Sequence, residues 1–171
     1  MNVDIVGQPC STTAMTGHHL AQMNIAVSRF PTTDPRMTDF MDALDEINAV
    51  ADASPGFVWR LVSEGANDAT SLRAEFGGAE QMVNMSVWDS PDSLWNYVYR
   101  SGHLDFLRRR GEWFESPSGP ITVLWWVAAG HIPTVEEGVD RLQRLRSDGP
   151  SPDAFTFRQR YAPSDRSPAR S

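Results

Sequence analysis

Four stretches of the chain have the residue pattern of β-strands, and two helical patterns lie among them. This arrangement constrains the fold more than any other feature of the sequence. These stretches are residues 20–29, 57–62, 81–88 and 121–128. Asp34 begins an amphipathic helix between the first two strands, and Ser90 begins a second helix that runs to about Trp113. The order β-α-β-β-α-β is that of the ferredoxin-like, split βαβ unit. We therefore predict an α+β fold, with a four-stranded sheet and helices on one of its faces.

The C-terminal part of the chain adds one helix and one strand to this unit. Thr134 and Glu137 have the spacing of a capping box, which predicts a third helix that ends before Gly149. Residues 155–161 alternate between apolar and polar side chains, which predicts an edge strand. A short extra strand is also expected at 72–76, inside the loop that precedes the third main strand.

Composition at the two ends suggests one domain between two disordered tails. Residues 1–18 are rich in Gly, Ser and Thr, and residues 163–171 are rich in Ser, Pro and Arg. The domain is therefore expected to cover residues 19–162. Cys10 is the only cysteine, so no intrachain disulfide can form, and a reducing, cytoplasmic setting is expected.

Charge excludes several classes of partner. The formal net charge is -7, and all 15 basic residues are arginine. An acidic surface repels phosphate backbones, so we expect neither nucleic acid nor an anionic membrane as a partner. The absence of lysine excludes Schiff-base chemistry and a P-loop lysine. No apolar run approaches the roughly 20 residues that a membrane helix needs.

One face of the predicted sheet is apolar and has no helix assigned to it. Its side chains come from the first and third strands: Met23, Ile25, Val27, Val83, Met85 and Val87. Apolar surface of this extent implies a partner, and a second copy of the chain is the simplest one. We therefore predict a homodimer, a dimeric α/β barrel, with this face as the interface.

The opposite face of the same two strands is polar. It contains Gln22 and Asn24 on one strand, and Asn84, Ser86 and Trp88 on the other. Burying an amide without a partner costs about 1–3 kcal/mol. Facing amides below a helical layer therefore indicate a polar cavity between sheet and helices. The alternative, that these amides bond one another or loop backbone, stays open.

Two motifs resemble a known group of enzymes. The segment Trp88-Asp-Ser90, followed in a helix by Ser101-Gly-His103, resembles a signature of antibiotic biosynthesis monooxygenase domains. Further segments resemble an uncharacterised bacterial family in the same dimeric α/β-barrel superfamily. These segments are Leu20-Ala-Gln-Met-Asn-Ile25, Asp34-Pro-Arg-Met37, Ser54-Pro-Gly-Phe-Val-Trp-Arg60, Leu124-Trp-Trp-Val127 and Gly130-His-Ile-Pro-Thr134.

The resemblance implies an oxygenase that needs no cofactor. Quinone-forming members of the superfamily use a strand-one Asn and a strand-three Asn and Trp, which match Asn24, Asn84 and Trp88. Their donors hold a substrate oxygen as charge develops on it. His103 is a fourth catalytic candidate. The substrate-binding candidates, for an aromatic or polyketide-like molecule, are Gln22, Arg60, Ser86, Tyr97 and Trp126.

Two other functions remain open. Haem-binding members of the superfamily also use a strand-one Asn, and here His103 or His131 would be the axial ligand. A non-redox role, as a cyclase, isomerase or ligand-binding protein, is the third reading. No flavin is expected, because the chain has neither a phosphate-binding glycine loop nor a lysine. No metal site is expected apart from a haem iron.

Overall fold

The computed structural model describes residues 17–64, 68–76 and 79–163. The predicted tails therefore lie outside the described residues, apart from Gly17, His18 and Pro163. Within the described ranges, no helix is long and apolar enough to cross a membrane.

The elements follow the predicted order, with additions. The strands are β1 (His18–Ala26), β2 (Phe57–Arg60), β3 (Arg73–Phe76), β4 (Ala79–Trp88) and β5 (Thr122–Ala128). The helices are the 3-10 turn η1 (Pro35–Met37), α1 (Thr38–Asp52), α2 (Pro91–Arg100), α3 (His103–Trp113) and α4 (Val135–Asp148). The short β3 occurs where an extra strand was expected.

All five strands form one antiparallel sheet in the order β2-β4-β1-β5, with β3 also paired to β4. β1 and β4 form the centre, and their register places Gln22 opposite Ser86 and Asn24 opposite Asn84. Side chains two apart on a strand share a face. These four polar side chains therefore lie on one face of the sheet.

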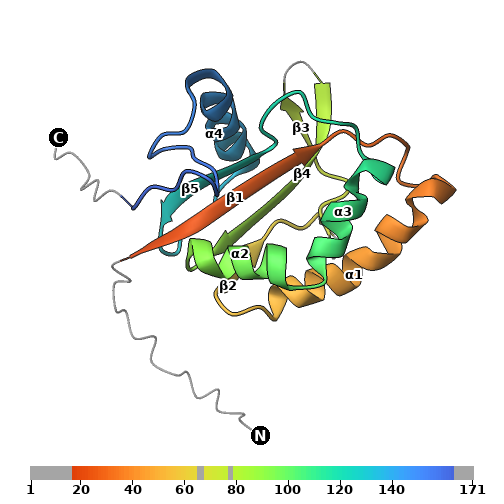
Figure 1. The fold of residues 1–171 in the computed structure, drawn as a ribbon, viewed down its shortest axis with the longest axis horizontal. Coiled ribbons are helices and arrows are strands. Elements are labelled where there is room, and N and C mark those ends of the chain that lie inside the picture. Colours follow the sequence, from red (N-terminus) through yellow and green to blue (C-terminus); the bar gives the residue numbers. More distant parts are fainter. Residues whose placement is uncertain (1–16, 65–67, 77–78, 164–171) are drawn as a thin grey trace, which may run out of the picture.

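The helices of the predicted four-stranded unit lie on one face as expected, but the other face, predicted to have no helix, is covered by α4. Figure 1 shows α1, α2 and α3 on one side and α4 on the other. Helix α4 packs on the apolar face: a Cβ added at Gly138 would collide with the Met23 side chain. Leu142 and Leu145 of α4 are buried in the same cluster as Met23 and Met85.

The apolar face predicted as the dimer interface is thus the core of the single chain. Met23 and Ile25 are fully buried, and Met85 is 1% exposed. The capping box of Thr134 and Glu137 predicted α4 correctly, with the Thr134 side chain accepting from the Glu137 backbone N–H at 3.2 Å. Nothing in the local residue pattern of α4 indicates which face of the sheet it covers.

A β-bulge in β2 changes which of its side chains face the helices. Phe57 lies opposite Trp88 and Arg60 lies opposite Ser86, with a register shift between Phe57 and Trp59. A bulge inserts one unpaired residue, so alternation is interrupted there. Strict alternation would place Phe57 on the same face as Trp59. In the structure Phe57 packs with Trp88, while Trp59 packs with the α4-side core.

The predicted long second helix is two helices, and one serine links them. The Ser101 hydroxyl donates to the Tyr97 carbonyl at the end of α2, and it accepts from the His103 backbone N–H at 3.2 Å. Serine favours helix ends because its hydroxyl competes for backbone groups. The break sets His103 at the first position of α3.

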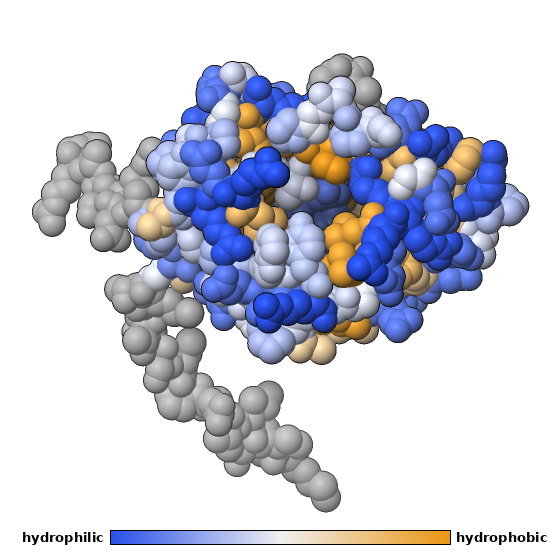
Figure 2. All heavy atoms as spheres, in the orientation of Figure 1, coloured by the Kyte–Doolittle hydropathy of each residue, from blue (hydrophilic) through white to orange (hydrophobic). Residues whose placement is uncertain are grey.

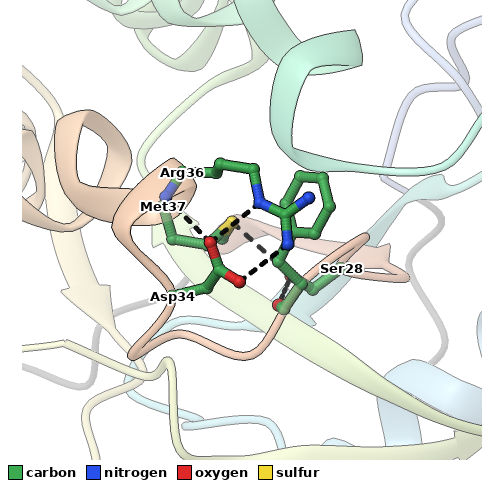
Figure 3. Close-up of polar contacts among 5 residues, drawn as sticks. Ser28, Asp34, Arg36 and Met37 are labelled. Carbon is green, nitrogen blue, oxygen red and sulfur yellow. Dashed lines mark hydrogen bonds and ion pairs between the residues drawn. The ribbon is translucent and has the colours of Figure 1, made fainter.

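The connection from β1 to α1 is held by a compact polar cluster (Figure 3). The Asp34 side chain accepts from the Arg36 backbone N–H at 2.9 Å and caps η1. The Arg36 guanidinium donates to the same carboxylate and lies 3.6 Å from the centroid of the Phe30 ring. This hydrogen bonding lowers the pKa of Asp34 to about 2.

The C-terminal segment does not form the predicted edge strand. Among the described residues beyond α4, Phe155 makes only an isolated antiparallel bridge with Leu124 of β5. Its backbone N–H and C=O both bond Leu124, at 2.8 and 2.9 Å. His18, expected in the tail, and His19, expected just before the first strand, are the first residues of β1.

Candidate functional site

A cavity of about 580 Å³ lies between the sheet and helices α1, α2 and α3. Figure 2 shows a hollow near the middle of this face of the molecule, with hydrophobic residues at its edge. The volume is within the range of pockets that bind small molecules. The side of the sheet that was predicted to be polar forms its floor.

The floor consists of two polar rungs between two apolar ones, where a rung is a pair of residues opposite each other on β1 and β4. In order along the strands, the rungs are Leu20–Trp88, Gln22–Ser86, Asn24–Asn84 and Ala26–Met82. Each apolar rung belongs to a separate buried cluster, one with Leu94 of α2 and one with Trp113 of α3. The helices therefore contact the sheet at both ends of the cavity, and the polar rungs lie between.

The Gln22–Ser86 rung is hydrogen-bonded within itself. The Ser86 hydroxyl donates to Gln22 Oε1 at 2.9 Å and accepts from the Trp88 indole N–H, also at 2.9 Å. All three side chains are buried. The chain of bonds satisfies the indole, so its N–H is already used, and the fully buried Trp88 ring lies behind the stacked Tyr97 ring.

This occupied N–H changes one part of the sequence-based model. Asn84 and Trp88 share a face, but four residues of a strand span about 13 Å. Ser86 lies between them and takes the indole N–H. The idea that Asn24, Asn84 and Trp88 donate to a single substrate oxygen is therefore wrong for this structure, although all three residues line the one cavity.

The Asn24–Asn84 rung is the part of the floor with free hydrogen-bonding capacity. Asn24 Nδ2 donates to Thr122 Oγ1 of β5 at 3.0 Å. The Asn84 amide has no hydrogen-bond partner among the described residues, and this side chain is exposed to the cavity. An amide offers two N–H donors and one acceptor oxygen. Asn84 can therefore bind a polar group on a ligand without breaking a bond of the protein.

An aromatic stack forms the wall toward α2 and α3. The Tyr97 ring stacks on Trp88 with centroids 5.1 Å apart and contacts the His103 ring at 5.0 Å. Burial raises the pKa of the Tyr97 phenol well above its usual value, so the phenol stays protonated.

His103 is a neutral base on the same wall. Burial lowers the pKa of its imidazole, partly opposed by a hydrogen bond to the Val98 backbone. Its Nδ1 atom is buried and has no hydrogen-bond partner among the described residues. A neutral imidazole at pH 7 can accept a proton, which an imidazolium cannot.

Arg60 lines the cavity from β2 but is paired with a carboxylate. Its Nε donates to Asp52 Oδ1 of α1 at 2.7 Å, and a second guanidinium nitrogen donates to Oδ2 at 3.2 Å. This two-point ion pair joins α1 to the sheet. Arg60 is therefore held in position at the cavity wall by its own partner.

Two residues named from the sequence do not line the cavity. The Trp126 indole N–H donates to the Tyr161 carbonyl at 2.8 Å, and the C-terminal segment packs on this side chain. His131 is exposed and lies 2.9 Å from the Glu137 carboxylate of α4, which packs on the other face of the sheet. Strand patterns could not show this. Whether Trp126 is accessible depends on where the C-terminal segment packs, and the surroundings of His131 depend on where α4 packs.

Among the cavity residues that were not identified from the sequence are Asn48, Arg110 and Thr122. Thr122 is the one polar residue in the apolar run of β5, which was a usable signal. Asn48 lies within the apolar stripe of α1 and is buried. Arg110 belongs to a run of three arginines, so nothing in the local pattern distinguished it from its neighbours. Among the described residues, no group of His, Cys, Asp or Glu is placed to hold a metal ion.

Comparison with known families gives a match over most of the chain. The model described as "Domain of unknown function (DUF3291)" matches residues 19–171. No curated protein matches the chain.

Two solved structures are similar over most of their length. A mutant of SnoaB, a cofactor-independent oxygenase from Streptomyces nogalater, is 15% identical and has a TM-score of 0.40, over 70% of this chain and 100% of SnoaB. NE2512, a protein of unknown function from Nitrosomonas europaea, is 14% identical with a TM-score of 0.40, over 70% of this chain and 97% of that one. Similarity at this level does not carry a function from either protein to this chain.

Proposed function

The chain belongs to the DUF3291 family, and we propose that it is a cofactor-independent monooxygenase that uses O₂ to oxidise an aromatic or polyketide-like small molecule. The observation that carries the proposal is the cavity floor, where Asn24 and Asn84 face each other between two apolar clusters. Such a site suits a flat apolar molecule with one polar edge. The motif resemblance of Trp88-Asp-Ser90 and Ser101-Gly-His103 points to the same chemistry.

In the proposed reaction the substrate supplies the electrons. A base removes a proton from a CH₂ group that is conjugated with a carbonyl through aromatic rings, and the resulting enolate transfers one electron to O₂. The substrate radical and superoxide combine through a new C–O bond, and the protonated base returns its proton to give a hydroperoxide. Loss of the second C–H proton with cleavage of the O–O bond then gives a carbonyl and water. The net change is CH₂ + O₂ → C=O + H₂O, and no external reductant is needed.

Each proposed role uses a property already described. The free Asn84 amide, beside Asn24, donates to the enolate oxygen, where a positioned donor lowers the barrier. His103 accepts the first proton, because its lowered pKa keeps the imidazole neutral. Tyr97, stacked on the buried Trp88, provides the flat wall, and Gln22 and Ser86 hold Trp88 in place. Arg60 lines the cavity wall and is paired with Asp52, so it is not a free cation.

Oxygen uptake with anthrone as the probe tests this function. Wild-type protein should consume O₂ faster than the spontaneous oxidation of anthrone. Asn84→Ala should lose about 10²–10³ in turnover, the typical effect of removing one such donor. Asn96→Ala, on the exposed surface of α2, is the matched control and should keep wild-type activity. Equal rates for wild type and Asn84→Ala would remove the proposed role of the amide.

Haem binding is the second candidate, and one observation favours it. Of the two histidines considered as axial ligands, His103 lines the cavity. Haem would supply redox chemistry, with His103 as the protein ligand. Adding haemin to the purified protein and recording the Soret band checks this: a band that disappears in His103→Ala would favour haem over the cofactor-free reaction. A cavity that binds anthrone without O₂ uptake or haem would point to the non-redox role.

We also propose that the sheet and its helices form a ferredoxin-like unit and that the protein is a homodimer. The order β2-β4-β1-β5 with two crossover helical units is the arrangement expected of a ferredoxin-like unit. Because α4 covers the face first predicted for dimer contact, a homodimer has to form through another surface. Light scattering at micromolar concentration measures the molecular mass in solution and so tests the homodimer. A monomeric mass would contradict the proposed dimer but would not affect the proposal for the cavity.

A further inference from the structure

The charge of the cavity wall differs in sign from that of the whole chain. The chain carries a formal charge of -7. The charged residues that line the cavity are Arg60, Arg110, Arg158 and Asp68. Asp52 pairs with Arg60, so two arginines and one aspartate remain. A net positive wall in an acidic protein indicates an anionic ligand, since field lines concentrate in a low-dielectric cleft.

Arg110 is the half-buried member of this group. Its guanidinium donates to the Glu115 backbone carbonyl at 3.3 Å and lies 5.3 Å from the centroid of the Phe114 ring. It has no carboxylate partner among the described residues. Burial lowers the pKa of this guanidinium, the sign of a cation that is desolvated without a compensating anion.

The neighbouring Arg109 shows what an arginine of this helix does when carboxylates are available. It lies 2.8 Å from Asp39 and 2.9 Å from Glu112, and it faces solvent. Arg109 thus has two partners at the surface, whereas Arg110 has a carbonyl and an aromatic ring at the cavity. Arg110 is therefore a half-buried cation at the cavity that has no carboxylate partner among the described residues, so its charge is available to a ligand.

Backbone contacts place Arg110 at the Asn24–Asn84 end of the cavity. The end of α3 runs beside the end of β1: the Glu115 N–H donates to the Val27 carbonyl at 2.9 Å. Phe114 belongs to the apolar cluster that includes Ala26, two residues beyond Asn24. The aromatic stack on Trp88 lies at the opposite end of the floor.

We infer that the cavity binds a flat aromatic carboxylic acid, with its carboxylate on Arg110 and its ring system extending toward Trp88. A guanidinium matches a carboxylate with two parallel N–H···O bonds. One unpaired cation at this end suits a monoanion. This inference rests on the proposed function for the location of the ligand, but it requires no reaction with oxygen.

Binding of 2-naphthoate and of its neutral isostere 2-naphthamide tests the inference by calorimetry. Wild type should bind 2-naphthoate at least tenfold more tightly than 2-naphthamide. Arg110→Gln should lose that preference and leave the affinity for 2-naphthamide within about twofold. Arg109→Gln, one position away on the same helix, is the matched control and should keep the preference. Arg110→Lys retains a charge and should keep part of it.

Three results would overturn the inference: equal binding of both probes by wild type, a preserved preference in Arg110→Gln, or equal loss in Arg109→Gln. The thermal unfolding midpoint of each variant shows whether the fold is intact. If Arg110→Gln does not fold, Arg110→Lys takes its place, and a preference undiminished in Arg110→Lys would overturn the inference. Because 2-naphthoate has no CH₂ group to oxidise, its binding is independent of the anthrone experiment. Arginine-dependent naphthoate binding without anthrone oxidation would reject the oxygenase and leave this inference standing.

Discussion

The two faces of the central strands β1 and β4 differ, although successive residues of the same strands point alternately to one face and to the other. On one face Met23, Ile25 and Met85 form a buried cluster with Leu142 and Leu145 of α4 and have almost no exposed area. On the other face the middle rungs are polar, and helices α1, α2 and α3 contact the sheet through the apolar clusters at its ends. One face is a solid core and the other is the floor of a cavity of about 580 Å³.

In this sheet one face contributes mainly to the stability of the fold, and the other face is the floor of the cavity. Burying an apolar side chain against a helix lowers the free energy of the folded state, so α4 packs closely on its face of the sheet. Burying an amide without a hydrogen-bond partner raises that free energy. The helices on the other face contact the sheet only at its apolar ends, so the amides between them stay accessible. The two faces should therefore respond very differently to the same substitution.

The largest effect should come from placing a charge on the solid face. Met85→Asp would bury an unpaired carboxylate beneath α4 and should destabilise the fold by more than about 4 kcal/mol. Asn84→Asp, the adjacent residue on the cavity face, should cost less than about 1 kcal/mol. Urea unfolding of both variants measures the contrast. If Met85→Asp were as stable as Asn84→Asp, α4 would not cover that face.

A smaller effect should come from the hydrogen-bonded rung of the cavity floor. Ser86→Ala leaves the Trp88 indole N–H and Gln22 Oε1 without their shared partner. A buried donor without an acceptor costs about 1–3 kcal/mol. Ser71→Ala, at an exposed position, should change the unfolding free energy by less than about 0.5 kcal/mol. Matching values for the two variants would mean that this rung does not contribute to stability.

The strand patterns predicted the polar and apolar faces well, because alternation fixes parity on regular strands. Asn24 and Asn84 share a face and line one cavity with Trp88. Parity failed in β2, where the bulge between Phe57 and Trp59 interrupts alternation. A bulge leaves no clear mark in a four-residue strand. The sequence also could not show that Ser86 would take the Trp88 N–H, because that depends on side-chain geometry.

Long-range packing accounts for the remaining errors. The position of α4 follows from the small Gly138 that lets it approach Met23, and a local pattern does not show this pairing. The same limit applies to Trp126, which the C-terminal segment covers, and to Arg110, which differs from Arg109 only in where it points. Local periodicity assigns elements and faces, but it does not say which element covers a face.

The smallest predicted effect is a pH dependence that belongs to the cavity face. Burial lowers the pKa of His103 in the folded state, so below about pH 6.5 the unfolded chain takes up a proton that the folded chain does not. Stability should therefore fall as the pH drops below about 6.5 and level off below the folded pKa. The slope from one such group is at most about 1.4 kcal/mol per pH unit. His103→Gln should flatten this part of a urea-unfolding profile, and an unchanged slope would mean that His103 is not buried.

The central claim is that the cavity face, and not the α4 face, receives the ligand through its free amide rung. The most direct measurement follows the side-chain amide resonances of ¹⁵N-labelled protein during titration with 2-naphthol, a neutral phenol that does not depend on Arg110. We expect the NH₂ signals of Asn84 and Asn24 to shift with one saturating curve, while that of the exposed Asn96 on α2 stays in place. Binding of 2-naphthol that leaves the Asn84 and Asn24 signals unmoved would contradict the account.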